Sequence, residues 1–278
     1  MAQNQLDVLS VGDVVIDAFI NLLENQGHIE ANNHHPNLCI PFGVKIPYDF
    51  AEVIPAVGNA SNASVAFAKL GLKSGLVSNI GDDSYGRDIL KALQKAKVDD
   101  RFVHINRGKK TNYHYVLWYR EERTILIKHE EYEYHWPRFR IIDIPNWIYF
   151  SSVSKNSLQY HHAISEWLDA HPPVKLAFQP GTFQMLAGTK RLKRLYERTE
   201  VLSVNREEAV AISGGAHDDI HNLLDRLHNL GPKIVVISDG HKGAYASDGT
   251  NRFKMPIYPY RPFSILIHYG MRRYSWLI

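Results

Sequence analysis

Two glycine turns that carry short polar side chains stand close together in the first third of the chain. Residues 58–62 read GNASN and begin a run of small residues that ends at Gly71, and residues 81–86 read GDDSYG. A glycine turn that leads into a helix leaves backbone N–H groups exposed, and amide side chains beside it add donors and acceptors. Such a turn can bind a polyhydroxylated or an anionic ligand. We therefore expect a ligand site here, with contacts from Gly58, Asn59 and Asn62.

Asp17 is a further candidate contact, because it follows the apolar run of residues 6–15 by two positions. We expect that run to form the first buried strand, and ligands of open α/β sheets bind at the carboxyl ends of strands. Taken alone, Asp17 is better explained as a solvated turn residue. Beside the turn at residues 58–62, ligand binding becomes the better interpretation. Asn62 also fits a helix N-cap, and the two roles are compatible.

Asn205 and Glu208 follow an expected strand at residues 201–204 and are spaced Asn-x-x-Glu. Side chains three residues apart share one side of a first helical turn, so both can face a metal-bound phosphate. A helix capping box explains the same spacing about equally well. The position after a strand favours a ligand role.

Residues 238–243 read SDGHKG and also follow an expected strand. Two glycines in such a loop let the backbone approach phosphate or ribose closely. A plain turn at the end of the strand is the alternative. The candidate nucleotide contacts in this loop are Ser238, Gly240 and Gly243.

Two common nucleotide-binding patterns are missing from the sequence. It contains no Gly-x-x-x-x-Gly-Lys-Ser/Thr, and residues 11–13 (VGD) do not begin Gly-x-Gly-x-x-Gly. His217 and His221 have a spacing that could bind a metal, but the pattern His-Glu-x-x-His is absent. We interpret these two histidines, and the adjacent pairs at residues 34–35 and 161–162, as solvated.

Predicted strands and helices alternate along most of the chain, which indicates βαβ units and an α/β fold with a mainly parallel sheet. The periodicity of apolar residues is the basis for each element. Expected strands cover residues 76–80, 147–150, 175–178, 201–204 and 234–238, and expected helices cover residues 62–70, 88–96, 159–170, 189–197 and 217–230.

Three segments break this alternation. Residues 113–119 and 124–128 read as an antiparallel hairpin, and residues 245–255 read as an antiparallel edge pair. Residues 21–47, rich in Asn, His and Pro, have no clean period and look like an excursion from the core. The aromatic side chains of the hairpin alternate between strand faces, so we expect them in a lid and core rather than in a base-stacking platform: Tyr113, Tyr115, Trp118 and Tyr119.

Composition describes an ordinary folded protein of 278 residues with 45% hydrophobic residues and a net charge of +3. The chain has no basic run that would indicate a nucleic-acid or membrane surface. Cys39 is the only cysteine, so no intrachain disulfide can form, and a reducing compartment is the simpler expectation. The polar start lacks signal-peptide features, and no window approaches the ~20 apolar residues of a membrane span. We therefore expect a soluble, cytoplasmic protein.

The ordered motifs resemble those of the ribokinase-like (PfkB-type) carbohydrate kinases. The family pattern is Gly-Gly-Asn-x-x-Asn, an alanine-rich helix, Leu-Gly and then Gly-Asp-Asp-x-x-Gly, and here Val57 replaces the first glycine. Asn-x-x-Glu and Ser/Thr-x-Gly-x-x-Gly follow in the family's order. The resemblance implies a single ribokinase-like domain over residues 1–278, a three-layer α/β sandwich with a mainly parallel central sheet. A small β-rich lid is implied at about residues 18–50 and 111–130.

The resemblance also implies the activity and the role of each motif. It implies transfer of the γ-phosphate of ATP to the hydroxyl of a sugar or a sugar-like acceptor, with Mg²⁺. Positions matching Asp17, Gly58 and Asn62 contact the acceptor in the family, and we place Asn59 with them. The nucleotide contacts implied are Asn205, Glu208, Ser238, Gly240 and Gly243, with Glu208 acting on Mg²⁺ indirectly through the phosphates.

One family element is absent from the sequence: a late Gly-Ala/Cys-Gly-Asp, whose aspartate takes the acceptor proton in the family. Residues 261–273 read RPFSILIHYGMRR where it is expected. With permissible codons, a one-nucleotide frame shift over residues 268–273 gives Thr-Thr-Gly-Cys-Gly-Asp. We hypothesise a frameshifted or truncated reading frame, and we expect catalysis by this chain to be impaired.

Two rival functions stay open beside the kinase. The first is a non-catalytic sugar- or nucleotide-binding protein, and the second is an interaction protein that assembles through its lid sheet. We expect a small-molecule partner, no nucleic acid, no membrane and a homodimer through the lid.

Overall fold

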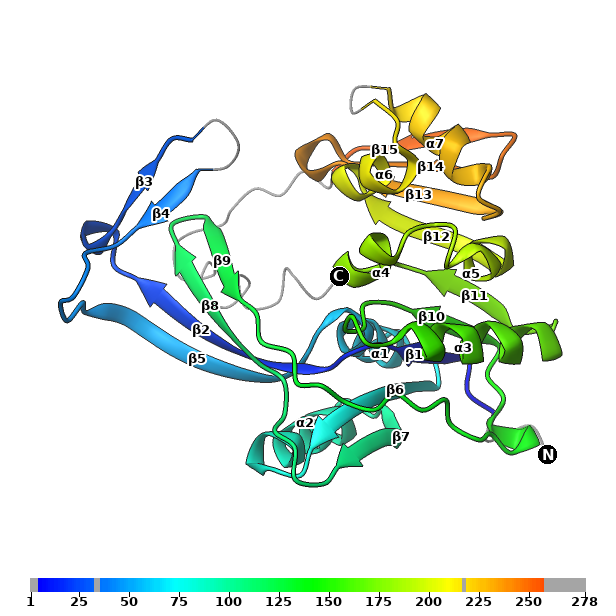
Figure 1. Ribbon diagram of the computed structural model, residues 1–278, viewed down its shortest axis with the longest axis horizontal. Coiled ribbons are helices and arrows are strands. Elements are labelled where there is room, and N and C mark those ends of the chain that lie inside the picture. The colour runs from blue at the N-terminus through cyan, green and yellow to red at the C-terminus, as the bar shows by residue number, and fades with distance from the viewer. Residues whose placement is uncertain (1–4, 33–35, 217–218, 258–278) are drawn as a thin grey trace.

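The computed structural model describes residues 5–32, 36–216 and 219–257, and Figure 1 shows their arrangement. A large sheet forms the centre, with strand order β15-β14-β13-β12-β11-β10-β1-β6-β7. All neighbours from β13 to β7 pair in parallel, whereas β14 and β15 pair antiparallel at one edge. The bounds are β1 Val8–Val11, β6 Ser74–Gly81, β7 Asp99–Asn106, β10 Trp147–Phe150, β11 Lys175–Phe178, β12 Thr199–Asn205, β13 Ile234–Ser238, β14 Ala244–Ser247 and β15 Arg252–Met255.

Helices connect the parallel strands, as the strand order requires. Short polar or glycine residues precede several of them; Asp83, for example, caps α2 by accepting a hydrogen bond from the Gly86 backbone at 2.9 Å. The helices are α1 Asn59–Lys69, α2 Ser84–Lys95, α3 Leu158–Ala170, α4 Thr182–Ala187, α5 Lys193–Arg198, α6 Arg206–Ser213 and α7 Ile220–His228.

Both faces of the central sheet are buried. Neighbouring residues of β6 point to opposite faces, and Leu76 belongs to one apolar cluster while Val77 belongs to the other. The first cluster contains Ile89 and Leu93 of α2, and the second contains Ile164 of α3. Helices therefore cover both faces, which confirms the expected three-layer α/β arrangement around a mainly parallel sheet.

A small sheet projects from the central one, on the left of Figure 1. Its order is β5-β2-β8-β9, with β2 and β8 parallel and the outer pairs antiparallel. This arrangement confirms the expected hairpin and the expected small β-rich sheet. A two-stranded ribbon, β3 with β4, extends from it. The bounds are β2 Val15–Leu22, β3 His28–Glu30, β4 Asn37–Cys39, β5 Tyr48–Val57, β8 Tyr113–Tyr119 and β9 Glu122–Leu126.

The expected first strand is divided by the structure. The apolar run at residues 6–15 ends β1 at Val11 and starts β2 at Val15, and these two strands belong to different sheets. The turn between them contains Gly12, where an added Cβ would lie 2.8 Å from Ala60 Cβ and 2.9 Å from the Ser152 carbonyl. The run is apolar throughout, which is why it was expected to form one strand. Gly12 allows the backbone to turn next to Ala60 and Ser152, and the chain passes there from the central sheet into the small sheet.

Two expected helices also differ from those observed. The helix expected at residues 189–197 starts only at Lys193, and a separate helix, α4, precedes it at Thr182–Ala187. The helix expected at residues 217–230 is the shorter α7, and residues 217–218 lie outside the described part. Within the described residues, no helix is long and apolar enough to cross a membrane.

Candidate active site

The glycine turn at Gly58 packs directly against the turn between β1 and β2. Gly58 is the N-cap of α1 with φ of +110°, and an added Cβ would lie 2.7 Å from the carbonyl oxygen of Asp13. Its own carbonyl accepts a hydrogen bond from the backbone of Asn62 at 2.8 Å. A side chain at Gly58 is therefore excluded both by backbone conformation and by space, and the two turns form one surface.

The expected acceptor contacts differ in their burial. Asp17 is 8% exposed, whereas Asn59 is exposed and Asn62 is intermediate. Asn62 lies inside α1, not at its N-cap, so the capping alternative for this residue is wrong. Its Oδ1 atom is buried and has no hydrogen-bond partner among the described residues. A buried amide oxygen without a partner is costly, because it has given up its hydrogen bonds to water.

Asp17 faces a histidine that sequence reasoning missed. The parallel pairing of β2 with β8 places His114 directly opposite Asp17, with His114 Nδ1 3.5 Å from Asp17 Oδ1. Both residues are at least nine-tenths buried. In the described part of the chain, neither Asp17 Oδ1 nor His114 Nε2 has a hydrogen-bond partner.

Asp13, in the turn between β1 and β2, is a second buried carboxylate, and it was also missed. The Tyr134 hydroxyl lies 2.7 and 3.0 Å from the two Asp13 carboxylate oxygens, and His129 Nδ1 lies 3.6 Å from Asp13 Oδ2. Burial, followed by the nearby charge of Asp13, raises the pKa of Tyr134, so its phenol stays protonated. The only local signal for Asp13 was its position after a strand and a glycine.

The second glycine turn, residues 81–86, has a structural role. Asp83 accepts hydrogen bonds from the backbone and the hydroxyl of Thr111, at 2.9 and 2.6 Å. A Cβ at Gly81 would lie 2.5 Å from the Lys109 carbonyl. Burial tends to raise the pKa of Asp83, but the hydrogen bonds from Thr111 and Gly86 outweigh it and lower the pKa. This turn joins α2 to the chain entering β8 and thereby supports His114.

Three strands away from β1 in the central sheet, at the end of β12, Asn205 and Glu208 form the capping box of α6. Asn205 Oδ1 accepts from the Glu208 backbone at 2.7 Å, and Glu208 Oε2 accepts from the Asn205 backbone at 2.8 Å. Burial raises the pKa of Glu208, partly opposed by this hydrogen bond. The prediction of a helix capping box at Asn205 and Glu208 is therefore confirmed. A ligand contact by either side chain would be a second role.

The loop at residues 238–243 ends β13 and turns back into β14. Around Gly240, which has φ of +49°, the space for a Cβ is open to 4 Å from every described atom. At Gly243, with φ of +93°, a Cβ would overlap the Met255 carbonyl. An ion pair between the buried Arg206 and Asp239 joins this loop to the start of α6. Gly243 thus serves packing, while Gly240 leaves room for a ligand.

The two halves of the candidate site share one edge of the sheet. The turn after β1, Asn205 at the end of β12 and Ser238 at the end of β13 all lie at carboxyl ends of parallel strands, and Asn205 pairs with Ser238. Strands β1 and β12 are separated by three strand spacings, about 14 Å.

One prediction about the other histidines is wrong. His161 was expected to be solvated, but it is 4% exposed, and its Nδ1 lies 2.6 Å from the Ser157 carbonyl. Desolvation lowers its pKa, so this ring is a neutral core group. His162 and His221 are exposed as expected. Residues 34, 35 and 217, and the whole region of residues 258–278 to which the frameshift hypothesis applies, lie outside the described residues.

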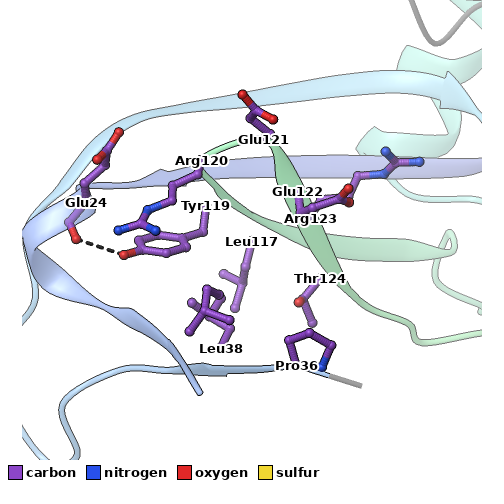
Figure 2. A pocket seen from close by; sticks show the side chains of 11 residues that line it. Glu24, Pro36, Leu38, Leu117, Tyr119, Arg120, Glu121, Glu122, Arg123 and Thr124 are labelled. Atoms are coloured by element: carbon purple, nitrogen blue, oxygen red, sulfur yellow. Dashed lines mark hydrogen bonds between the residues drawn. The ribbon is translucent and has the colours of Figure 1, made fainter. Parts of the chain in front are cut away.

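A separate pocket of about 930 Å³ lies on the small sheet, between the β8–β9 turn and the β3–β4 ribbon (Figure 2). The Tyr119 hydroxyl donates to the Glu24 and Gly27 carbonyls at 2.9 and 2.7 Å and fixes the ribbon there. The charged side chains of Arg120 and Glu121 extend around it. None of the expected ligand contacts lines this pocket.

Among the described residues, no group of three or more His, Cys, Asp or Glu side chains is arranged to hold a metal ion. Magnesium in phosphoryl transfer is held largely by substrate phosphates and water, with few protein ligands. A magnesium ion held in this way does not require a preformed cage of protein ligands.

Comparison with known proteins identifies the relatives of this chain. Residues 53–261 match the pfkB family of carbohydrate kinases. An ATP-dependent 6-phosphofructokinase of Thermoanaerobacterium thermosaccharolyticum is 22% identical over 207 residues, covering 69% of this chain and 62% of the relative. A 5-dehydro-2-deoxygluconokinase of Bacillus velezensis is 25% identical over 206 residues, covering 68% and 62%. The chain thus spans about three fifths of the length of these curated relatives.

Solved structures agree on the fold. The fructokinase of Halothermothrix orenii superposes with a TM-score of 0.68 at 19% identity, covering 98% of this chain and 90% of that chain. An Arabidopsis thaliana ribokinase, solved with ribose and ATP, gives a TM-score of 0.67 at 18% identity, covering 91% and 78%. The family match extends over most of the chain, from before the glycine turn to beyond β15. The chain therefore belongs to the pfkB family of carbohydrate kinases.

Proposed function

We propose that this chain is an ATP-dependent carbohydrate kinase that directs the γ-phosphate of ATP to a hydroxyl of a sugar. The observation that carries this proposal is the buried carboxylate of Asp17, whose Oδ1 has no hydrogen-bond partner among the described residues. It lies on the strand that starts beside the Gly58 turn. A buried acceptor of this kind needs donors, and sugar hydroxyls provide them.

We assign the acceptor to four residues. Asp17 accepts hydroxyl hydrogen bonds, and the side chains of Asn59 and Asn62 add donors and acceptors at the start of α1. Gly58 keeps the chain close to Asp13 and leaves its own position free of a side chain. These groups orient the acceptor, and orientation is most of what phosphoryl transfer requires from a protein.

The nucleotide is assigned to the β12 and β13 ends, where Asn205, Glu208, Ser238, Gly240 and Gly243 lie. The open face of Gly240 supports a close approach of ribose or phosphate. Glu208 is held by its cap and contributes negative charge toward Mg²⁺ through the phosphates. Bound Mg²⁺ supplies neutralisation of the charge that develops on the phosphates.

We further propose that transfer by this chain is slow. The sequence contains no Gly-Ala/Cys-Gly-Asp, and residues 258–278 contain no aspartate or glutamate. A positioned general base contributes about 10²- to 10⁴-fold to a rate, so a similar loss is expected without one. The alternative function, capture of a sugar or nucleotide without turnover, rests on this same observation.

A homodimer through the small sheet completes the proposal. Val53, Ala18, Tyr115 and Leu126 lie opposite one another on consecutive strands, so they form one row across a single face. Val53, Tyr115 and Leu126 are about half exposed. Such a row is typical of an interaction surface. A cytoplasmic location is proposed with it, because Cys39 is the only cysteine.

The test combines nucleotide binding with turnover. Calorimetric titration of the chain with ATP and Mg²⁺ is expected to give saturable binding, and Gly240→Val is expected to weaken it. Gly249→Val serves as the control, because Gly249 also has positive φ and open space but lies in the β14–β15 turn. ADP formation is then followed with a panel of neutral sugars. Unchanged ATP affinity in Gly240→Val would contradict the nucleotide assignment, and rapid sugar-dependent ADP formation would contradict the proposed slow transfer.

A further inference from the structure

Two histidines and two buried carboxylates meet beside the proposed acceptor site, and they come from separate parts of the chain. Asp13 and Asp17 flank the start of β2, His114 lies on β8, and His129 follows β9. The rings of His114 and His129 are 5.3 Å apart between centroids and meet at 70°. Long-range packing therefore gathers four titratable side chains into one cluster.

Each histidine faces one carboxylate at a distance that is too long for a hydrogen bond. The separation is 3.5 Å from His114 Nδ1 to Asp17 Oδ1 and 3.6 Å from His129 Nδ1 to Asp13 Oδ2. The Asp13 carboxylate has the Tyr134 hydroxyl as a donor. No comparable side-chain donor to Asp17 Oδ1 exists within the described ranges.

The cluster is also short of hydrogen-bond partners. Asp17 Oδ1, His114 Nε2 and His129 Nδ1 are buried atoms that lack one in the part of the chain that the structure describes. Structural side chains rarely leave three such atoms in one place, because each carries a desolvation cost. The cost is explained if a ligand supplies the missing partners.

The geometry selects the chemistry of that ligand. A hydroxyl oxygen placed against a histidine–aspartate pair can donate its proton to the carboxylate and accept from the imidazole N–H. Neighbouring hydroxyls of one sugar can do this at both pairs. A carboxylate group has no proton to donate at neutral pH, a phosphate ester is mostly a dianion there, and either anion would face two buried carboxylates.

We infer that His114 and His129, each with its aspartate, bind neighbouring hydroxyls of the acceptor and select an uncharged sugar over one that carries an anionic group at this position. This inference rests on the proposed function and adds the class of acceptor to it. It assigns His114 and His129 to acceptor selection, beyond the residues that the motifs identify.

The experiment is calorimetric titration with matched probes: D-fructose, D-ribose and D-glucose, each beside its terminal phosphate ester. At least one neutral sugar is expected to bind at least tenfold more tightly than its phosphate ester. His114→Leu and His129→Leu are expected to weaken binding of that sugar about tenfold each, the equivalent of one hydrogen bond at the upper end of the usual range. His162→Leu, an exposed histidine on α3, is the control and is expected to leave affinity unchanged.

A merely structural role gives a different result. Circular dichroism melting shows whether each variant is folded, and His114→Gln, which keeps a donor and an acceptor, is expected to recover part of the affinity lost in His114→Leu. Sugar affinity that persists in both folded leucine variants but falls in Asp17→Asn overturns this inference and leaves the acceptor site in place. Equal or tighter binding of the phosphate esters also overturns it. Absence of any sugar binding by the wild-type chain overturns both this inference and the proposed function.

Discussion

Replacing Gly58 with alanine tests whether the two turns of the proposed acceptor site are held in contact by the absence of a side chain. Gly58 has φ of +110° and ψ of 153°, a conformation that only glycine adopts easily. Forcing alanine into it costs about 1 to 3 kcal/mol. The new Cβ would lie 2.7 Å from the backbone oxygen of Asp13, which has no flexible end that can move aside. Relief of this contact adds a penalty of about 1 to 3 kcal/mol.

We expect Gly58→Ala to lower the free energy of unfolding by about 3 kcal/mol, and the melting temperature by about 9 °C, at 2 to 4 °C per kcal/mol for a chain of this size. The assay is urea and thermal unfolding followed by circular dichroism. Gly71→Ala is the matched control, because Gly71 follows the other end of α1 with φ of +88° and no described atom within 4 Å of its Cβ position. The control is expected to cost about 1 kcal/mol from backbone strain alone. Equal losses in the two variants would refute the role of the Asp13 contact.

Three further predictions concern the same architecture. Tyr134→Phe removes the donor at 2.7 Å from Asp13 and is expected to cost about 1.5 to 3 kcal/mol, measured by urea unfolding; a loss under half that value contradicts the role of this bond. The pKa of Glu208 is higher in the folded state than in the unfolded state, so the folded state keeps this proton to a higher pH. The free energy of unfolding therefore falls as pH rises from the unfolded-state pKa to the folded-state pKa. Glu208→Gln, which can still cap Asn205, is expected to flatten the pH dependence of stability just above pH 4.5, and an unchanged profile would contradict this. Tyr115→Glu is expected to convert the proposed dimer to a monomer by light scattering, and an unchanged mass argues against the apolar row as the interface.

Sequence reasoning recovered the elements whose signals are local. Short apolar segments between expected helices located β10, β11 and β13 at their observed bounds. The β-rich segments located the hairpin of β8 and β9, although β9 begins and ends two residues earlier than expected. The spacing of Asn205 and Glu208 predicted a capping box among its alternatives, because a cap depends only on residues three positions apart. These features depend on neighbours in the chain, so a pattern in the sequence is sufficient to find them.

The parts that were missed depend on distant contacts. His114 could not be identified as a site residue from its local sequence, because it lies near Asp17 only through the parallel pairing of β2 and β8. Asp17 is nearly a hundred positions earlier in the chain. Tyr134 and Asp13 are 121 positions apart, and nothing in the local sequence of either indicates the contact. The apolar run that contains Val11 looked like one strand because burial does not reveal that the chain moves between sheets at a glycine. Contacts between residues far apart in the sequence can be predicted only after the pairing of the strands is known.

The central claim, that the buried carboxylate of Asp17 binds a sugar, is tested most directly by comparing the wild-type chain with Asp17→Asn in calorimetric titrations with the neutral sugar that the wild type binds best. Asparagine keeps the shape of the side chain but removes its charge and replaces one acceptor oxygen with a donor. We predict a loss of affinity of at least tenfold, from one or two charge-assisted hydrogen bonds, while melting shows that the variant remains folded. Equal affinity in the two proteins, with both folded, would contradict the account.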